Sequence, residues 1–459
     1  MLIYRDSTGS MRGARGALMA LLAVGALALS ACDLGVVNPE IIEEDDLMIP
    51  DAIPAIVNGA RHTFGMATTI QGAGGVYSAS AALTDELTHV GSWVPPREIS
   101  DGVPGNESPE NQSHWGYTSR ARWQAEDAID KLETILDDAS SNEWMAMAVL
   151  YAGLASRVQG DMFCEAVINS GELLPHTAFY ERAEAHFDRA ITVAEAAGSE
   201  DLRLAAYAGR AQTRMMLGDW SGAVADAGVV PTDFVYVQPH SDNSATEYNG
   251  VFEWTALASG QYSVWGTPFA EWGLDLSGKV ASEGDPRVSY LSLAATVDGN
   301  PAEMIGGDDR RPFWFAQKYT SRNDDIAIAK GTEMRLIEAE ASLRGGDLAG
   351  ALTLINDVRS LHGLSAVSAA DLDEGWELLM KERGIELWLE GRRLPDLRRW
   401  ASDSSTRQYI QTTAVRGVAQ GKPADEDPVL NVLEASPFCL RISTDEIFTN
   451  PHLSERTPT

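Results

Sequence analysis

Three glutamates spaced four residues apart are the first feature of this 459-residue sequence that suggests chemistry. Glu382, Glu386 and Glu390 would share one helical face, because four residues make about one helical turn. Two carboxyl groups can cleave a glycosidic bond, but they must face each other across a cleft, about 5–9.5 Å apart. A single row lacks that geometry. Four arginines follow it: Arg392, Arg393, Arg398 and Arg399. We therefore expect a structural network of carboxylates and guanidinium groups and no catalysis.

Tryptophans outside any helical period form the second group of interest. The C–H faces of sugar rings stack on indole rings, while Asn, Asp and Arg side chains bind the hydroxyl groups. The candidates for such contacts are Trp93, Trp265, Trp272 and Trp314. Core packing is the alternative for each of them, since tryptophan is usually largely buried. The tryptophans on predicted helices or their entries are expected in the core: Trp115, Trp123, Trp144 and Trp388.

Other chemistries have no support in the sequence. It contains no G-x-S-x-G nucleophile elbow, no phosphate-binding loop and no dinucleotide fingerprint. Its eight histidines are scattered, and neither C-x-x-C nor H-E-x-x-H spacing occurs, so no metal and no cofactor is expected. A formal charge of -32 excludes nucleic acid as a partner, because phosphate binding needs clustered Lys and Arg.

Residues 1–31 have the order of a secretion signal. Basic residues precede the apolar run Ala17 to Leu29, which is too short to span a bilayer. The run ends in LSAC, which resembles the site cut by lipoprotein signal peptidase and would leave Cys32 as a diacylated N-terminus. An ordinary signal peptide with Cys32 as a bystander is the alternative. The acidic, aperiodic residues 32–50 then form a tether between the membrane and the folded body.

Two further cysteines, Cys164 and Cys439, lie far apart in the sequence. In an oxidising compartment they could form a disulfide. Spacing alone cannot show that they are close in space, so two buried free thiols are favoured, and the disulfide stays an open alternative.

Apolar residues recur at helical spacing through most of the chain. Helices are expected over 51–91 with a break at three glycines, and over 114–137, 144–158, 177–197 and 202–217. The stretch Trp376 to Trp400 predicts a helix buried on most sides, a turn at Gly391 and a second short helix at Pro395. Between these helical parts, alternating apolar residues in Thr232 to Leu257 predict a hairpin. The stretch Ser259 to Arg322 is rich in Gly, Pro and aromatics and has no helical period.

An internal repeat relates residues 210–227 to residues 338–355 at an offset of 128. The shared positions are Ala211 with Ala339, Gly218 with Gly346, Asp219 with Asp347, Gly222 with Gly350 and Ala223 with Ala351. A helix, a Gly-Asp turn and a second helix with small residues at the crossing are typical of a tetratricopeptide unit.

Four stretches resemble the SusD/RagB family of nutrient-binding outer-membrane lipoproteins. They are ERGIELWLEGRRLPDLRRW (382–400), GTEMRLIEAEASLRGGDLAGALTLINDVRSLHG (331–363), the Asp285-Pro286-Arg287 and Lys318-Tyr319 landmarks, and FCLRISTDEIFTNPHL (438–453). In the last stretch Arg441 and Ser443 replace two prolines of the family pattern. The resemblance implies a mainly α, tetratricopeptide-like scaffold with an irregular, loop-rich insert that contains short strands. It also favours ligand binding between the loop around Trp93 and that insert.

This reading predicts a signal peptide over 1–31, a tether over 32–50 and one SusD-like domain over 51–459. Within the domain we expect helical repeats at about 114–227 and 332–400, the insert at about 228–330 and a C-terminal segment over 401–459. The predicted function is non-catalytic. A surface-exposed lipoprotein of the outer membrane, held by its N-terminal lipid, would bind an oligosaccharide or another nutrient and deliver it to a TonB-dependent, SusC-like transporter. The alternative is a tetratricopeptide-type scaffold for a protein or peptide partner.

Overall fold

The structure, a computed structural model, describes residues 47–102, 105, 107–255, 260–293, 295–297, 300–410, 415–416, 429–430 and 438–453. The folded unit runs from Pro50 to Thr459. The predicted lipidation site at Cys32, the signal segment and nearly all of the tether lie outside the described residues. None of the described helices is both long and apolar enough to cross a membrane.

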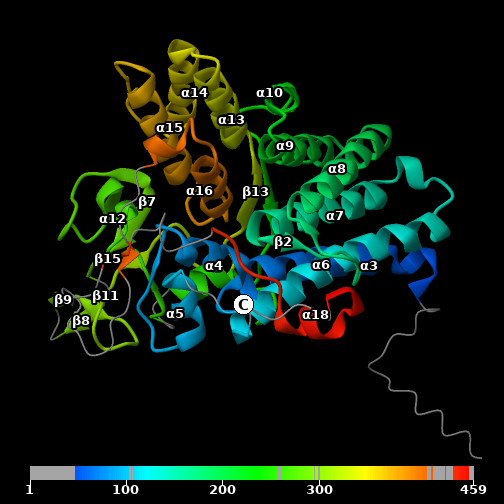
Figure 1. Cartoon of the computed structure of the whole chain (residues 1–459), viewed down its shortest axis with the longest axis horizontal. Coiled ribbons are helices and arrows are strands. Elements are labelled where there is room, and N and C mark those ends of the chain that lie inside the picture. The colour runs from blue at the N-terminus through cyan, green and yellow to red at the C-terminus, as the bar shows by residue number, and fades with distance from the viewer. Residues whose placement is uncertain are drawn as a thin grey trace, which may run out of the picture. The chain divides into compact units, whose positions relative to one another are not determined.

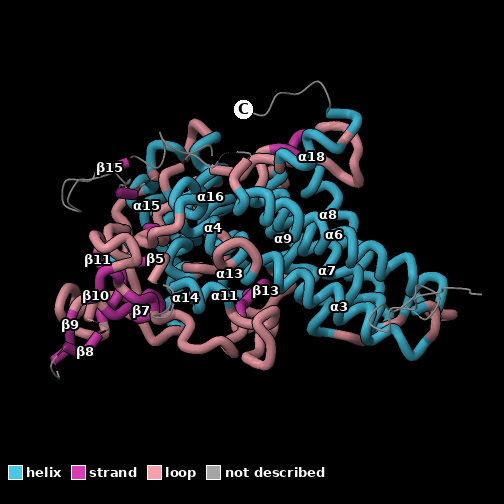
Figure 2. The backbone as a smooth tube through the Cα atoms, turned by 90° about the horizontal axis from the view of Figure 1, so that it is seen from below, coloured by secondary structure: helices cyan, strands magenta, loops and turns pink. Residues whose placement is uncertain are grey.

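Helices dominate this unit (Figures 1 and 2). The longer ones are α3 (Ile53–Gly65), α4 (Gly75–Leu83), α6 (Pro109–Ile135), α7 (Glu143–Met162), α8 (Thr177–Ala197), α9 (Glu200–Leu217), α10 (Trp220–Ala227), α13 (Gly331–Arg344), α14 (Leu348–Leu361), α15 (Leu372–Glu386) and α16 (Arg393–Ser402). The shorter ones are α5 (Val94–Ser100), α11 (Gly250–Thr255), α12 (Pro268–Trp272) and α18 (Thr444–Thr449). The predicted mainly α fold class is confirmed. So is the break in the first helical stretch, where glycines with positive φ precede α4.

The strands are short, and most of them gather at one end of the unit (Figure 2). The one three-stranded sheet among the described residues has the order β12 (Phe315–Ala316), β7 (Asp285–Leu291), β6 (Gly273–Asp275). The two-stranded pairs are β1 (Thr88–His89) with β5 (Tyr262–Ser263), β2 (Glu165–Ala166) with β3 (Leu174–Pro175), β4 (Val235–Gln238) with β13 (Ile326–Lys330), β8 (Ala295–Val297) with β9 (Asn300–Ala302), β10 (Met304–Ile305) with β11 (Pro312–Phe313), and β14 (Val415–Arg416) with β15 (Val429–Leu430).

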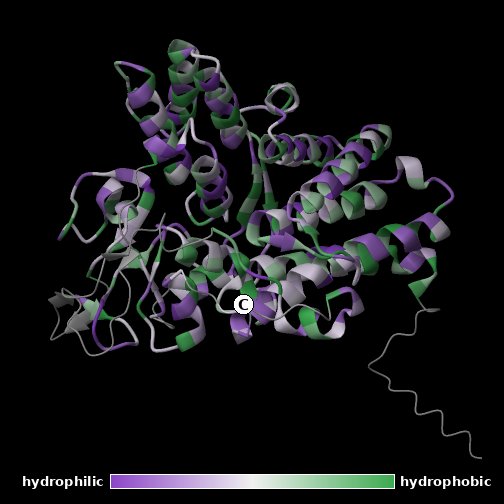
Figure 3. Cartoon of the chain, viewed as in Figure 1, coloured by the Kyte–Doolittle hydropathy of each residue, from purple (hydrophilic) through white to green (hydrophobic). Residues whose placement is uncertain are grey.

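Buried apolar side chains form one continuous cluster from Ile53 on α3 to Leu453 after α18. A small second cluster of Val90, Phe313 and Phe315 lies under the strand-rich end. Apolar and polar residues alternate along the helices in Figure 3, as expected when each helix turns one face to the core. The same core thus supports the helices and holds the insert in place.

The internal repeat forms two helix pairs, α9–α10 and α13–α14, with the same turn. Gly218 and Gly346 have φ of +81° and +80°, the left-handed conformation that glycine adopts most readily. The next residue caps the second helix: an Asp219 oxygen accepts from the Gly222 N–H at 3.0 Å, and an Asp347 oxygen accepts from the Gly350 N–H at 2.9 Å. A Cβ at either capped glycine would lie 2.1 or 2.2 Å from the capping carboxylate. The left-handed turn thus explains Gly218 and Gly346, and the caps explain Gly222 and Gly350.

The predicted hairpin between Thr232 and Leu257 is wrong. Only its first half is a strand: β4 pairs with β13, almost 90 residues later, in antiparallel register from Gln238↔Ile326 to Val235↔Lys330. Its second half is helix α11. Alternation in a sequence shows that a strand has one buried face but does not show which strand lies beside it. The β4–β13 pair instead closes the base of the insert.

The stretch Trp376 to Trp400 forms two helices and a longer turn than predicted. Helix α15 ends at Glu386, so Glu390 does not continue the row of Glu382 and Glu386. Leu389 has a φ of +58°, and its N–H donates to Oε1 of the buried Glu86 at 2.8 Å instead of to a helical carbonyl. The left-handed conformation predicted at Gly391 is confirmed, with a φ of +73°. A tertiary contact thus ends the helix early.

Cys164 and Cys439 form a disulfide, with their Cα atoms 5.0 Å apart, so the free thiols favoured above are a wrong prediction. The residues next to them are joined by backbone hydrogen bonds: the Cys164 N–H donates to the Leu440 carbonyl at 2.8 Å, and the Leu440 N–H donates to the Met162 carbonyl at 2.6 Å. The C-terminal segment is therefore tied to the end of α7. Ser443, one of the two departures from the family pattern, caps α18 by accepting from the Glu446 N–H at 3.1 Å.

Candidate functional site

Trp93 lies at the surface and stacks on Trp254. It is the N-cap residue of α5, and Pro95 and Pro96 in the first turn fix the start of that helix. Its side chain is 50% exposed. The two indole rings are nearly parallel, at 6°, with centroids 5.7 Å apart. We call Trp93 and Trp254 the aromatic pair. The exposed half of the Trp93 side chain is available for stacking on a saccharide.

The aromatic pair joins the early loop to the insert. Just before Trp93, β1 pairs with β5, with Thr88 opposite Ser263 and His89 opposite Tyr262. The ring of Trp254, on α11, packs against Tyr262 at a centroid distance of 6.4 Å. These contacts fix the pair from both sides. The two regions indicated by the family resemblance therefore meet here, although Trp254 was not among the predicted site residues.

Polar side chains lie beneath the loop that carries Trp93. The Arg97 guanidinium donates to the Gly91 carbonyl at 3.1 Å. Arg311 is fully buried and pairs with Asp308 at 2.6 Å. Burial, with Arg311 and Arg97 nearby, lowers the pKa of His89 to about 3, so its imidazole is neutral at physiological pH. His89 and Arg311 are both fully buried, so they support the Trp93 loop from inside the protein, and only the Arg97 side chain is partly exposed.

Trp265 and Trp314 lie together at a second place in the insert. Their backbone N–H groups both donate to the Ser263 hydroxyl, at 3.1 and 2.8 Å. The Trp314 ring stacks on Tyr290 with centroids 5.6 Å apart, and its indole N–H donates to Glu303 at 3.1 Å. Both tryptophans are partly buried. These contacts hold Trp314 in the sheet region, where its ring packs against its neighbours.

Trp272 lies elsewhere, at the end of α12. Its ring packs against Phe269 at 5.0 Å, and the Lys381 ammonium lies 5.5 Å from its centroid. It lines a cavity of about 270 Å³ beside α15. The structure thus divides the four predicted tryptophans among three places.

The tryptophans predicted to be in the core differ in their outcome. Trp115 and Trp388 are buried at 3% and 0% exposure, and the half-buried Trp144 packs against the core cluster. Trp123 is the exception: it is 54% exposed, so the core prediction is wrong there. A broad apolar helix face inferred from the sequence does not show which residues at its edge stay exposed to solvent.

The glutamates of the predicted network are buried, but they pair with partners other than those predicted. Glu382 pairs with Arg287 at 2.7 Å and with Arg359 at 3.0 Å. Glu386 pairs with Arg287 at 3.1 Å, Lys330 at 3.0 Å and His362 at 2.9 Å, and it accepts from the Thr332 hydroxyl at 2.7 Å. Glu390 pairs with Lys318 at 2.7 Å and with Lys330 at 3.2 Å. Burial alone would raise the pKa of Glu386, but Lys330 and His362 hold that pKa well below its ordinary value. Glu386 is therefore a buried anion in ion pairs.

The four arginines bind other groups. Arg392 pairs with Glu333 at 3.3 Å, Arg393 with Asp85 at 2.6 Å, and Arg399 with Glu340 and Asp396; Arg398 donates to the Phe163 and Gly160 carbonyls and to the Tyr180 hydroxyl. The predicted pairing of this arginine group with the glutamate row is therefore wrong. Because the helix ends at Glu386, the following turn carries the arginines away from the row, towards Asp85 just after α4 and towards acids on α13 and α16.

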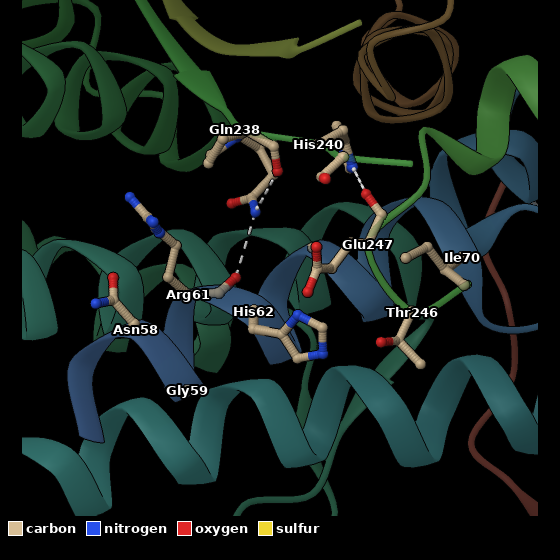
Figure 4. A pocket seen from close by; sticks show the side chains of 12 residues that line it. Asn58, Gly59, Arg61, His62, Ile70, Gln238, His240, Thr246 and Glu247 are labelled. Carbon is tan, nitrogen blue, oxygen red and sulfur yellow. Dashed lines mark hydrogen bonds between the residues drawn. The ribbon is translucent and has the colours of Figure 1, made fainter. Parts of the chain in front are cut away.

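A polar cavity of about 550 Å³ lies between α3 and the segment after β4 (Figure 4). In Figure 4 the Glu247 carboxylate and the His62 ring point towards one another. The His240 ring bonds to the Glu247 carbonyl at 3.2 Å, and Gln238 donates to the Arg61 carbonyl at 3.4 Å. None of the described residues that line this cavity is Trp, Tyr or Phe, so its lining offers hydrogen bonds to a ligand without an aromatic ring for stacking. None of the predicted site residues lines it. Polar residues on one helix face are common on any solvated helix, so the sequence gives no signal for it.

The aromatic pair thus combines an exposed, stacked indole with the partly exposed Arg97 side chain on the same helix. Among the residues that the structure describes, no cluster of three or more His, Cys, Asp or Glu side chains could hold a metal ion. The exposed indole of the aromatic pair is suited to non-covalent binding of a ligand with a flat apolar face.

Comparison with known proteins gives a consistent result. The sequence model described as the SusD family matches residues 316–458. No curated protein matches the sequence. A SusD-like carbohydrate binding protein from Bacteroides fragilis NCTC 9343 is similar in structure, with a TM-score of 0.63 at 13% identity, over 86% of this chain and 98% of that one. One from Bacteroides vulgatus ATCC 8482 has a TM-score of 0.61 at 14% identity, over 89% and 98%.

A laminarin binding SusD-like protein has a TM-score of 0.60 at 17% identity, over 85% of this chain and 98% of that one. At these identities the structures show a shared fold, and that fold extends over most of both chains. The family match covers the region that contains α13 to α18, including the second helix pair and the buried ion-pair network. Residues 316–458 therefore carry the SusD family signature, and the chain as a whole has the fold of the SusD-like proteins.

Proposed function

We propose that this protein binds an oligosaccharide at the aromatic pair and delivers it, without chemical change, to a TonB-dependent transporter of the outer membrane. The single observation that carries the proposal is the half-exposed Trp93 ring stacked on Trp254 at the junction of the early loop and the insert. An exposed aromatic that is fixed in place loses little conformational entropy on binding, so it suits a stacking surface.

The similar structures support the class of ligand. Two of those described above are named as carbohydrate binding proteins, and a third as binding laminarin. A role without catalysis is supported by the glutamate row, because its carboxylates are engaged in buried ion pairs and do not face each other across an open cleft.

The membrane location is proposed from the sequence alone. Lipid on Cys32, after the signal segment 1–31, would hold the protein at the outer membrane beside its transporter. Labelling with a radioactive fatty acid tests this point. Label should be incorporated into the wild type and be lost in Cys32→Ser, and a variant that is still labelled would refute lipidation at this residue.

The ligand is tested on the purified soluble domain. A glycan array identifies binders, and calorimetry then compares the wild type with Trp93→Ala and Trp254→Ala. Each substitution should weaken binding by about 1–3 kcal/mol, as expected for the loss of an aromatic anchor. Trp272→Ala is the matched control, because its ring packs against Phe269 and Lys381 at another place and its loss should leave the affinity unchanged.

Two results would contradict the proposal. Equal affinities of the wild type and both pair variants would place the glycan elsewhere. Absence of any glycan binding, together with binding of a protein or peptide, would favour the scaffold alternative.

A further inference from the structure

Trp123 lines a cleft far from the aromatic pair. Its side chain is 54% exposed on α6. The cleft has a volume of about 430 Å³ and is bordered by α6, the loop between β2 and β3, and α18. Figure 2 shows α18 well apart from α11, which carries Trp254. A ligand at Trp123 would therefore occupy a site of its own.

The rim of the cleft consists of hydrogen-bonding side chains. Arg120 and Gln124 come from α6, Asn169 and Ser170 from the β2–β3 loop, and Glu446 from α18. Asn169 and Ser170 are exposed and adopt φ of +51° and +55°, a conformation that non-glycine residues rarely adopt. Such backbone strain persists only where the surroundings fix it, and it is common at binding sites.

Buried contacts fix this rim. Arg122 is 3% exposed and donates to the Asn169 side-chain oxygen at 3.1 Å and to the Gln159 side-chain oxygen at 2.8 Å. The Asn450 amide donates to the Gly171 carbonyl at 2.9 Å, which ties the loop to the residue after α18. The disulfide at Cys164 lies just before β2. The loop and α18 are thus held in place before any ligand arrives.

The lining favours a saccharide over a protein partner. Among the described residues, Trp123 and Val167 are its only apolar side chains, and the others are Ser, Arg, Gln, Asn and Glu. The core of a protein interface is more apolar than this and depleted of charged residues. An exposed indole surrounded by amide, guanidinium and carboxylate groups instead suits a sugar ring, which offers a C–H face for stacking and hydroxyls at its edge.

We propose that the Trp123 cleft is a second saccharide-binding subsite, which takes uncharged pyranose units of an oligosaccharide. This inference rests on the proposed carbohydrate-binding function but not on the aromatic pair. Two sites on one protein bind a long polysaccharide more tightly than either site alone, because the second contact becomes intramolecular. The loss of Trp123 should therefore affect long chains more than short ones.

The test is affinity electrophoresis of the wild type in gels that contain laminarin, starch, xylan or β-mannan, followed by the variants in each gel that retards it. Trp123→Ala should raise the apparent dissociation constant about 5- to 100-fold. Trp93→Ala should retain a weaker interaction, and the double variant should lose retardation. Phe448→Ala is the matched control: it removes a 69% exposed aromatic from α18 that does not line the cleft, and it should migrate as the wild type does.

Thermal unfolding shows whether each variant is folded; an exposed Trp123 should be replaceable with almost no change in Tm. If Trp123→Ala is retarded like the wild type while Trp93→Ala is not, the second subsite is refuted and the proposed function stands. If no polysaccharide retards the wild type, the proposed function fails and this inference fails with it. If Trp123→Ala changes only the association with a co-expressed transporter, the cleft is a protein contact and the inference is refuted.

Discussion

At the scale of single residues, buried ionisable side chains determine how the stability of the protein depends on pH. Glu86 lies fully buried under the turn after α15 and accepts the Leu389 N–H. Burial raises its pKa to about 8, although the Leu389 N–H and the Arg393 guanidinium partly oppose this shift. Its neighbour Asp85 is already paired with Arg393. Glu86 is therefore protonated in the folded protein at neutral pH.

The raised pKa of Glu86 predicts a stability that falls as pH rises. Below about pH 4.5 both the folded and the unfolded state bind the proton, so the contribution of Glu86 is fully present there. It is lost as the pH approaches about 8, because the unfolded state has already released its proton. Glu86→Gln should therefore match the wild type near pH 5 and become more stable by on the order of 3–5 kcal/mol near pH 9.

Chemical denaturation of Glu86→Gln and the wild type at both pH values measures this difference. Glu195→Gln on the exposed face of α8 is the control and should show no such divergence. Parallel pH profiles for Glu86→Gln and the wild type would mean that Glu86 is ionised in the folded state.

At the scale of elements, the two copies of the repeat differ in composition but share one turn. In both copies a left-handed glycine is followed by an aspartate that caps the next helix. The cap satisfies a backbone N–H that would otherwise have no intrahelical partner. The same small residues recur at the crossings, where Ala223 and Ala351 are buried. The helix pair is therefore specified locally.

Removal of either cap should destabilise the protein by a similar amount. Asp219→Ala and Asp347→Ala should each lower the free energy of unfolding by about 0.5–2 kcal/mol. Asp219→Asn and Asp347→Asn retain a side-chain acceptor and should lose only a few tenths of a kcal/mol. Urea denaturation of the four variants gives these values. If the alanine and asparagine variants were equally unstable, the carboxylate charge and not the cap hydrogen bond would be responsible.

At the scale of the whole molecule, the C-terminal segment is joined to the end of α7. The disulfide links residues 275 positions apart, and the neighbouring backbone bonds add a bridge between Phe163 and Leu440. The same region forms one side of the Trp123 cleft through Glu446. The covalent link thus supports both the fold and the proposed second subsite.

The double variant Cys164→Ala/Cys439→Ala should be less stable by about 2–5 kcal/mol, because a long loop in the unfolded chain is no longer closed. Its Tm should not respond to a reducing agent, whereas the Tm of the wild type should fall towards that of the variant under reduction. A wild-type Tm unaffected by reduction, with free thiols shown to be present by a thiol reagent, would contradict a stabilising role of the disulfide.

The sequence by itself determined the features that depend on neighbouring residues. The helices of α6 to α9, the Gly-Asp turns and the left-handed Gly391 all follow from period, capping and backbone sterics, which act within a few residues. The exposure of Trp93 could also be predicted, because a tryptophan in a loop rich in Pro, Gly and Ser has no helix face to pack on.

The tertiary structure alone decided which groups meet. Glu382 binds Arg287 and Arg359 instead of the arginines that follow it, and Trp93 stacks on Trp254, which lies more than 150 residues away in the sequence. The disulfide between Cys164 and Cys439 and the exposure of Trp123 likewise could not be predicted from the sequence. Local rules fix the direction of the chain over a few residues. The partner of a side chain depends instead on how whole segments pack. Because α15 ends at Glu386, the charged side chains that follow point to other partners than a continued helix would give them.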